Sequence, residues 1–201
     1  MKKSLALLAA LFILTVGCSA LRSVSSQDKT QDKAQDKAPV GRITGDQAAQ
    51  ADVMKELRNK LLTAKPDELL DGEDAKAKVW GVLMDVSFPS GTATLVSIRD
   101  GTASLYTTSG GGVLGGYIAR EQAKEFVVAA EKHLKEMSLT ESFPYPANGR
   151  VKFYVLTRDG VLTAEAGLNE LGERKHKLWT LYYAADQVLT QLRLASEKNK
   201  P

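Results

Sequence analysis

Five glycines fall within the eight residues 109–116, which read SGGGVLGG. The spacing Gly110-x-Gly112-x-x-Gly115 matches the dinucleotide-binding fingerprint, in which glycines let the backbone approach a pyrophosphate at a helix N-terminus. That chemistry requires a parallel strand–helix–strand unit. Here the preceding strand belongs to a predicted hairpin, and the next predicted strand begins only at residue 151. The sequence context therefore argues against a nucleotide site.

Two roles remain open for this glycine-rich segment. The first is structural, because successive glycines suit a tight connection whose backbone needs positive φ angles. The second is a small-ligand or anion site, since a concave run of backbone N–H groups can hold an anion. We expect the structural role. The candidate ligand loop would consist of Ser109, Gly110, Gly111, Gly112, Gly115 and Gly116.

The side chains that commonly do acid–base chemistry are few and scattered. His133 shares a predicted helix face with core residues, and His176 stands in the charged run ERKHK, where we expect it to be solvated. Glu165, Glu170 and Glu173 cluster after a predicted hairpin, and paired carboxylates can act as general acid and base. We expect them to serve in turns and helix caps. The sequence predicts no catalytic residues, so we expect a protein that is not an enzyme.

Composition excludes several classes of site. Cys18 is the only cysteine, so the chain can form neither an internal disulfide nor a cysteine-based metal site. We expect no metal and no cofactor. The formal net charge of +3 includes Lys2 and Lys3, which we expect to be removed, and no basic stripe with interleaved aromatic residues is present. We therefore expect no nucleic-acid partner.

The first eighteen residues, MKKSLALLAALFILTVGC, combine two lysines with an apolar run from Leu5 to Val16. This run is shorter than the roughly 20 residues that span a bilayer, but it suits a secretory signal. The segment, ending LTVGC at Cys18, resembles a bacterial lipoprotein signal. It differs slightly from the usual motif, because the leucine lies four residues before the cysteine. An ordinary signal peptide or an uncleaved anchor with an incidental cysteine are the alternatives.

The resemblance implies cleavage of residues 1–17 and attachment of acyl chains such as palmitate to Cys18. Two or three acyl chains anchor a protein stably, because each buried CH₂ contributes about 0.8 kcal/mol. We therefore expect the protein to attach to a membrane, either the cell membrane or the outer membrane. In Gram-negative bacteria, lipoproteins with serine after the cysteine usually reach the outer membrane, so Ser19 favours that location.

Residues 18–43 read as a tether. The triplet QDK occurs at 27–29, 31–33 and 35–37, and the stretch contains no aromatic residue. A segment of this kind cannot bury enough apolar surface to offset the entropy of ordering, so we expect a disordered linker. Residues 44–201 should then form a single globular domain, for which the 43% of hydrophobic residues in the chain is ample.

The domain should contain three helices and five strands. Helical periodicity covers 46–65, 119–137 and 176–196, and β-prone runs cover 78–88, 92–108 and 151–168. The first helix should bury an apolar stripe of Val53, Met54, Leu57, Leu61 and Leu62, and the second a stripe of Ala123, Val127, Ala130, Leu134 and Met137. Trp179 and Tyr183 flank the apolar stripe of the last helix. The last two β-prone runs each contain Arg-Asp-Gly, and the dipeptide Asp-Gly is a strong signal for a hairpin turn. Short hairpins imply an antiparallel sheet covered by helices, which is an α+β fold in the order helix-βββ-helix-ββ-helix.

This element order resembles profilin-like and roadblock-type sandwiches at the level of topology, which carries no function. The motifs VWGVLM, DGTASLY, SGGGVLGG, RVKFYVLTRDGVLTAEA and LYYAADQVLTQLR, within 79–193, together resemble a family of uncharacterised small bacterial proteins. That resemblance supplies no catalytic residues to carry over to this chain. We expect a membrane-anchored, non-catalytic binding or interaction module, and the sequence does not identify a protein partner. The alternative is an envelope receptor or enzyme that uses residues 109–116.

Overall fold

The computed structural model describes residues 41–42 and 47–198. The predicted signal peptide, Cys18 and the QDK triplets lie outside the described residues. The predicted tether reached residue 43, but Gly41–Arg42 forms a short strand, β1.

Seven helical segments and eight strands make up the described part of the chain. The helices are α1 (Gln47–Thr63), η1 (Pro66–Glu68), α2 (Gly72–Lys76), α3 (Arg120–Lys132), η2 (Leu134–Glu136), α4 (Leu168–Gly172) and α5 (Trp179–Lys198). The strands after β1 are β2 (Val79–Phe88), β3 (Gly91–Ile98), β4 (Ala103–Thr107), β5 (Gly112–Gly116), β6 (Ser138–Thr140), β7 (Arg150–Thr157) and β8 (Gly160–Gly167).

All the described strands join one antiparallel sheet in the order β1-β5-β4-β3-β2-β7-β8-β6. The predicted α+β class and antiparallel pairing are confirmed, but five strands was an undercount. The five predicted strands are β2, β3, β4, β7 and β8. The added strands lie at the sheet's two edges: β1 has two residues, β6 has three, and β5 is rich in glycine. Such segments lack the length or the β-branched residues that mark a strand in sequence.

Both predicted hairpin turns are confirmed. β3 and β4 turn at Asp100-Gly101, and β7 and β8 turn at Asp159-Gly160. Gly101 has φ +95°, and a Cβ there would lie 2.3 Å from Cγ of Arg120. The turn therefore needs glycine both for its backbone angle and for the close approach of α3.

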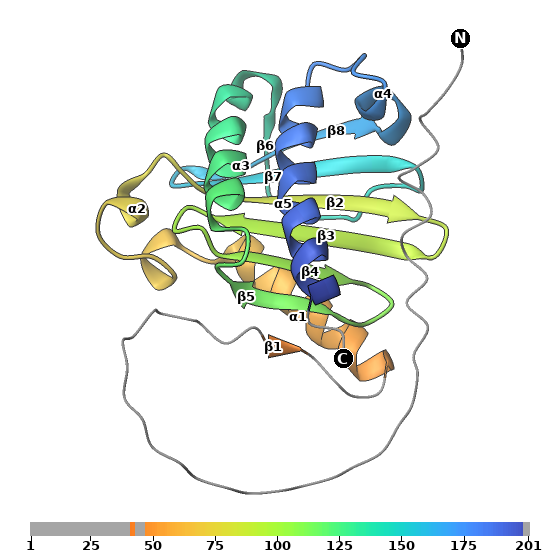
Figure 1. Ribbon diagram of the computed structural model, residues 1–201. Helices are drawn as coiled ribbons and strands as arrows, with labels where there is room; N and C mark the ends of the chain where they lie inside the picture. The colour runs from red at the N-terminus through yellow and green to blue at the C-terminus, as the bar shows by residue number, and fades with distance from the viewer. Residues whose placement is uncertain (1–40, 43–46, 199–201) are drawn as a thin grey trace, which may run out of the picture. The chain divides into compact units, whose positions relative to one another are not determined.

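Helices α3 and α5 lie side by side on one face of the sheet (Figure 1). Their apolar stripes follow the predicted periodicity, and Ala123, Val127, Leu181 and Val188 are fully buried. These side chains pack on the alternate, inward-facing residues of the strands, such as Phe153. This layer forms the larger of the two apolar clusters.

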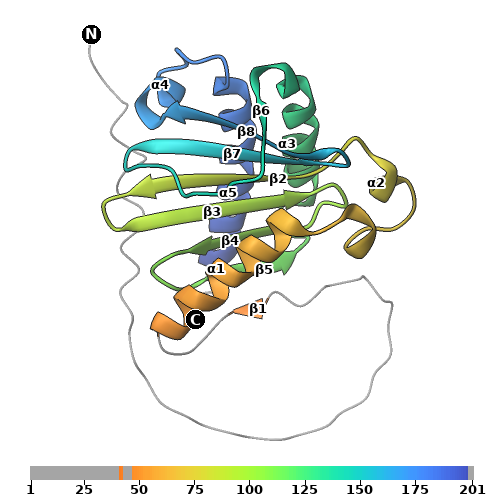
Figure 2. The same cartoon turned by 180° about the vertical axis from the view of Figure 1, so that it is seen from behind.

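Helix α1 covers the opposite face of the sheet (Figure 2). Its buried line runs through Met54, Arg58 and Leu62, which recur every four residues. Val53, which the predicted apolar stripe included, is instead 43% exposed. The stripe was wrong at this position because the line facing the sheet includes an arginine, which apolar periodicity does not register.

Candidate functional site

The glycine-rich segment has two parts. Residues 108–111 form a turn, and Gly112–Gly116 form β5, so the expectation that the whole segment is a loop was wrong. Gly110 and Gly111 have φ angles of +88° and +85°, and Gly112 has +155°. The segment runs between β4 on one side and β1 on the other. Strand pairing on both sides gives it a regular structure that its composition does not predict.

Hydrogen bonds within the turn occupy several of its polar groups. The Thr107 hydroxyl donates to the carbonyl oxygen of Gly110 at 2.8 Å and lies 3.0 Å from the Ser109 hydroxyl. The backbone N–H of Gly110 donates to Thr107, and that of Thr107 donates to Gly111. No side-chain cation contacts the turn in the hydrogen bonds and ion pairs of the described residues. The geometry supports a turn better than an anion site.

The most concentrated polar cluster of the described residues lies between α1 and the sheet. Arg58 Nε and Nη2 donate to Oδ2 of Asp85 at 3.0 and 2.6 Å, and both side chains are at most 2% exposed. Oδ1 of Asp85 accepts a hydrogen bond from the Thr94 hydroxyl at 2.6 Å. Asp85 lies on β2 and Thr94 on its neighbour β3, as directly opposed residues. The carboxylate is therefore bound at both oxygens.

The connection from β6 to β7, residues 141–149, closes this cluster from a third side (Figure 2). Arg58 Nη1 donates to the carbonyl oxygen of Phe143 at 3.0 Å, and the guanidinium stacks on the ring of Tyr145 at 4.3 Å. The Tyr154 hydroxyl, on β7, donates to the carbonyl oxygen of Pro144 at 2.6 Å. One arginine thus joins the helix, the sheet and this connection.

The electrostatics of the cluster follow from burial. Burial raises the pKa of Asp85, and the hydrogen bonds from Arg58 and Thr94 oppose that rise. Burial would lower the pKa of Arg58, but the hydrogen bond and charge of Asp85 raise it. Burial also raises the pKa of Tyr154 to about 12. The arginine stays charged, so the ion pair depends on the carboxylate that neutralises it.

This arrangement suits a structural role better than catalysis. Asp85 is fully buried and Arg58 is 1% exposed, so a substrate has no direct access to either group. Their hydrogen-bonding atoms are already engaged by Thr94 and Phe143. A general acid or base must reach a substrate proton within hydrogen-bond distance. The described geometry gives this pair no such reach.

This cluster was not predicted from the sequence. Arg58 and Asp85 lie 27 residues apart, and no local pattern links them. A weak signal was present, since Asp85 is a lone carboxylate inside the otherwise apolar run VWGVLMDVSF. A charge at that position of a buried strand requires a partner of opposite charge.

The structure separates the other predicted site residues. His133 Nδ1 lies 3.0 Å from Glu136 Oε2, and its Nε2 lies 2.8 Å from the Thr180 hydroxyl, so it joins the end of α3 to the start of α5. His176 Nδ1 accepts from the backbone N–H of Leu178 at 3.2 Å. His133 has the contacts of a hydroxyl–imidazole–carboxylate series. However, Thr180 is exposed on the first turn of α5, and neither of the described hollows includes it, so these three groups do not line a substrate site.

The three glutamates take separate partners. Glu165 on β8 pairs with Arg150 and Lys152 of β7. Glu170 accepts a hydrogen bond from the backbone N–H of Gly167 at 3.3 Å, which is the predicted capping role. Glu173 pairs with the exposed Lys175. Two hollows are described, one lined by α1 residues such as Lys55 and one by residues that include Arg99 and Lys124, and neither contains these glutamates.

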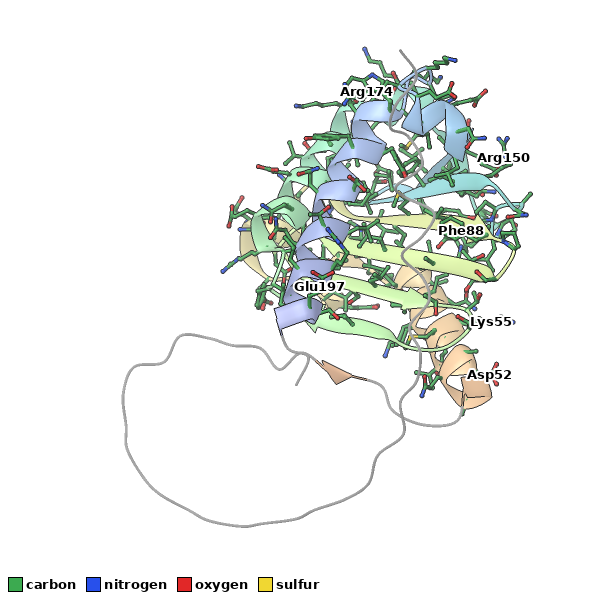
Figure 3. All side chains as sticks on the ribbon, turned by 45° about the vertical axis from the view of Figure 1, so that its right-hand side comes forward. Asp52, Lys55, Phe88, Arg150, Arg174 and Glu197 are labelled. Atoms are coloured by element: carbon green, nitrogen blue, oxygen red, sulfur yellow. The ribbon has the colours of Figure 1, made fainter. Side chains whose placement is uncertain are left out.

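Several large apolar side chains remain exposed on the helical layer. Tyr183 on α5 is 52% exposed, and Val128 on the neighbouring α3 is 42% exposed. Trp179 is half-buried, with the Arg174 guanidinium 5.4 Å from its ring centre. Figure 3 shows Arg174 near the start of α5 and Glu197 near its end. Of the two aromatic residues predicted to flank the apolar stripe of α5, Tyr183 is the one left open to a partner.

Residues 41–42 and 47–198 contain no cluster of three or more histidine, cysteine, aspartate or glutamate side chains that could hold a metal ion. Among the helices of this part of the chain, none is long and apolar enough to cross a membrane. Comparisons of the chain with protein-family models, curated proteins and solved structures gave no match. The sequence resemblances described above therefore stay predictions.

Proposed function

We propose that this chain is a membrane-anchored bacterial lipoprotein whose globular part is a non-catalytic binding or interaction module. The observation that carries the proposal is the position of Cys18, directly after an apolar run that suits a signal peptide but is too short to span a bilayer. Ser19 favours the outer membrane in a Gram-negative host. Acyl chains on Cys18 would hold the protein at the envelope.

Two features of the described residues support an interaction module. The strongest polar cluster, around Arg58 and Asp85, is engaged internally. In contrast, the outer surface of the helical layer carries open apolar side chains, including Val128, Tyr183 and Leu194. Exposed apolar side chains that gather on one layer favour contact with a protein partner. The resemblance to profilin-like and roadblock-type sandwiches concerns the order of elements only and supplies no argument about function.

The lipid anchor is tested by replacing Cys18→Ser and labelling cells with a fatty-acid analogue. We expect the variant to carry no fatty-acid label and to be lost from the membrane fraction. Ser19→Asp is the matched control, because it keeps the cysteine. That variant should retain the label and, in a Gram-negative host, shift toward the inner membrane. Labelling that survives Cys18→Ser would refute the anchor.

The alternative, a ligand site at 109–116, has a separate test. Purified protein is titrated with nucleotides, sugar phosphates and sulfate while the backbone amides of these residues are followed by NMR. We expect no saturable shifts, because β5 pairs on both sides and the turn engages its own polar groups. Saturable shifts confined to 109–116 would favour the receptor or enzyme alternative.

A further inference from the structure

One edge of the sheet is closed by a very short strand. β1 consists of Gly41–Arg42, and it pairs antiparallel with Leu114 and Val113 of β5. β5 has five residues, so β1 pairs with only two of them. A sheet edge presents backbone N–H and C=O groups that accept another strand. This edge already accepts one, and the contact that closes it is small.

The composition of β5 also suits exchange of its partner strand. Three of its five residues are Gly112, Gly115 and Gly116. Glycine inside a strand often marks a place where another backbone approaches closely, and glycine-rich strands specify their pairing weakly. The register of β5 with β4 is itself irregular between Ala103 and Leu105. Pairing at this edge is therefore less constrained than in the centre of the sheet.

Apolar side chains lie open on the elements beside this edge. Tyr117 and Ile118 directly follow β5 and are 38% and 37% exposed, and Val53 on the early part of α1 is 43% exposed. The Tyr117 ring packs against the Arg120 guanidinium at 5.0 Å, and its hydroxyl donates to Asp100 at 3.2 Å. A second protein surface that meets the edge would cover these side chains and gain apolar burial.

We propose that β1 is an exchangeable strand, and that Gly41–Arg42 of one copy pairs with β5 of a second copy of this chain. The exchanged pair reproduces the contacts already present within one chain, because the two sequences are identical. Reciprocal exchange gives two such pairs related by a two-fold axis, which closes the assembly as a dimer. The proposal names a partner for the interaction module proposed above and so rests on that function.

Chain length limits where the second copy can sit. Residues 43–46 separate β1 from α1, and that number of residues spans at most roughly 18 Å. The partner's β5 edge must therefore lie close to the start of α1. This places Val53, Tyr117 and Ile118 at or near the contact between the copies. A dimer built on the opposite sheet edge, at β6, would leave them open.

The test traps the exchanged strand between chains. Directly opposed residues of antiparallel strands have Cα atoms about 4.5–5.5 Å apart, which suits a disulfide. Full-length chains carrying Cys18→Ser and either Gly41→Cys or Leu114→Cys are given different tags, mixed in detergent and mildly oxidised. We expect a disulfide-linked heterodimer, at several times the yield of the matched control in which Lys177→Cys replaces Leu114→Cys. Lys177 is exposed and lies two residues before α5, outside the β5 edge and the start of α1.

Two outcomes would overturn the proposal. In the first, mixed chains cross-link no more than the Lys177→Cys control, while a single chain carrying both Gly41→Cys and Leu114→Cys closes its disulfide as a monomer; β1 then stays on its own sheet. In the second, Leu139→Cys on β6, where the side chain is 64% exposed, traps a homodimer instead. Because every chain in the test lacks Cys18, its failure leaves the lipid-anchor proposal standing.

Discussion

The two faces of the sheet are closed by different kinds of contact. Under α3 and α5, apolar side chains such as Phe126, Phe153 and Leu181 meet at full burial. Under α1, the apolar contacts of Met54 and Leu62 share the face with a buried ion pair between Arg58 and Asp85. Apolar packing tolerates many sequences of similar volume. An ion pair specifies one partner, so it fixes which residues of helix, sheet and connection must meet.

The two faces should also respond differently to the removal of a side chain. Removing an apolar side chain leaves a cavity, whose cost depends on how far the neighbours relax. Removing one partner of a buried ion pair leaves a charge without compensation, which relaxation cannot supply. The α1 face should therefore be more sensitive to single polar substitutions than the α3–α5 face is to conservative apolar ones.

The largest effect is expected from Asp85→Ala. It leaves the Arg58 guanidinium buried without a counter-charge and the Thr94 hydroxyl without its acceptor. We expect a loss of about 3–5 kcal/mol in the free energy of unfolding, measured by urea denaturation. Asp52→Ala, on the exposed side of α1 in Figure 3, is the matched control and should change stability by less than about 0.5 kcal/mol. Equal losses in the two variants would contradict the account.

A smaller loss is expected from Gly112→Ala. The added Cβ would lie 2.3 Å from the carbonyl oxygen of Leu105 and 2.8 Å from Cα of Tyr106, so the backbone of β4 must move. We expect a loss of about 2–3 kcal/mol, measured by thermal or urea unfolding. Gly172→Ala is the control, because a Cβ there meets nothing within 4 Å. A stable Gly112→Ala variant would show that β5 does not pack against β4 as described.

A third effect concerns alkaline pH. Burial raises the pKa of Tyr154 from 10.0 to about 12, so between these values the unfolded chain loses the proton while the folded chain keeps it. Stability should therefore fall as pH rises from 10 toward 12, by about 1 kcal/mol at pH 11 from this residue. Tyr154→Phe should flatten that part of the profile. Identical slopes in the variant and the unaltered protein would argue against the buried position of Tyr154.

The smallest effect is expected from Gly111→Ala. A Cβ there meets nothing within 4 Å, so the cost comes only from the φ angle of +85°. We expect a loss of about 1 kcal/mol, clearly below that of Gly112→Ala. Ser109→Ala, which keeps the backbone, should change stability by less than about 0.5 kcal/mol. If Gly111→Ala costs more than Gly112→Ala, strain in the turn outweighs packing of the strand.

The features that could be predicted from the sequence lie mostly on the α3–α5 face, and those that could not lie mostly on the α1 face and at the β5 edge. The stripe of Ala123, Val127 and Ala130 and the two hairpins at Asp100-Gly101 and Asp159-Gly160 were predicted, because local periodicity and turn chemistry encode them. The α3–α5 face is built almost entirely from such patterns.

The missed features depend on contacts between distant residues. β5 is a strand because β4 and β1 pair with it, although glycine is a poor strand former. Val53 was placed on the buried face of α1, whereas Arg58 occupies that face because Asp85 lies opposite it. Neither the strand pairing of β5 nor the Arg58–Asp85 contact can be read from residues that are neighbours in the sequence.

The central claim, that the Arg58–Asp85 pair is a structural joint of the α1 face, is tested most directly by a double-mutant cycle. Asp85→Leu, Arg58→Met and the double variant are compared with the unaltered chain by urea denaturation. We expect each single variant to lose about 3–5 kcal/mol and the double variant to recover at least half of the larger loss, because it removes both buried charges together. Losses that simply add in the double variant would contradict the claim, since the two side chains would then stabilise the fold independently.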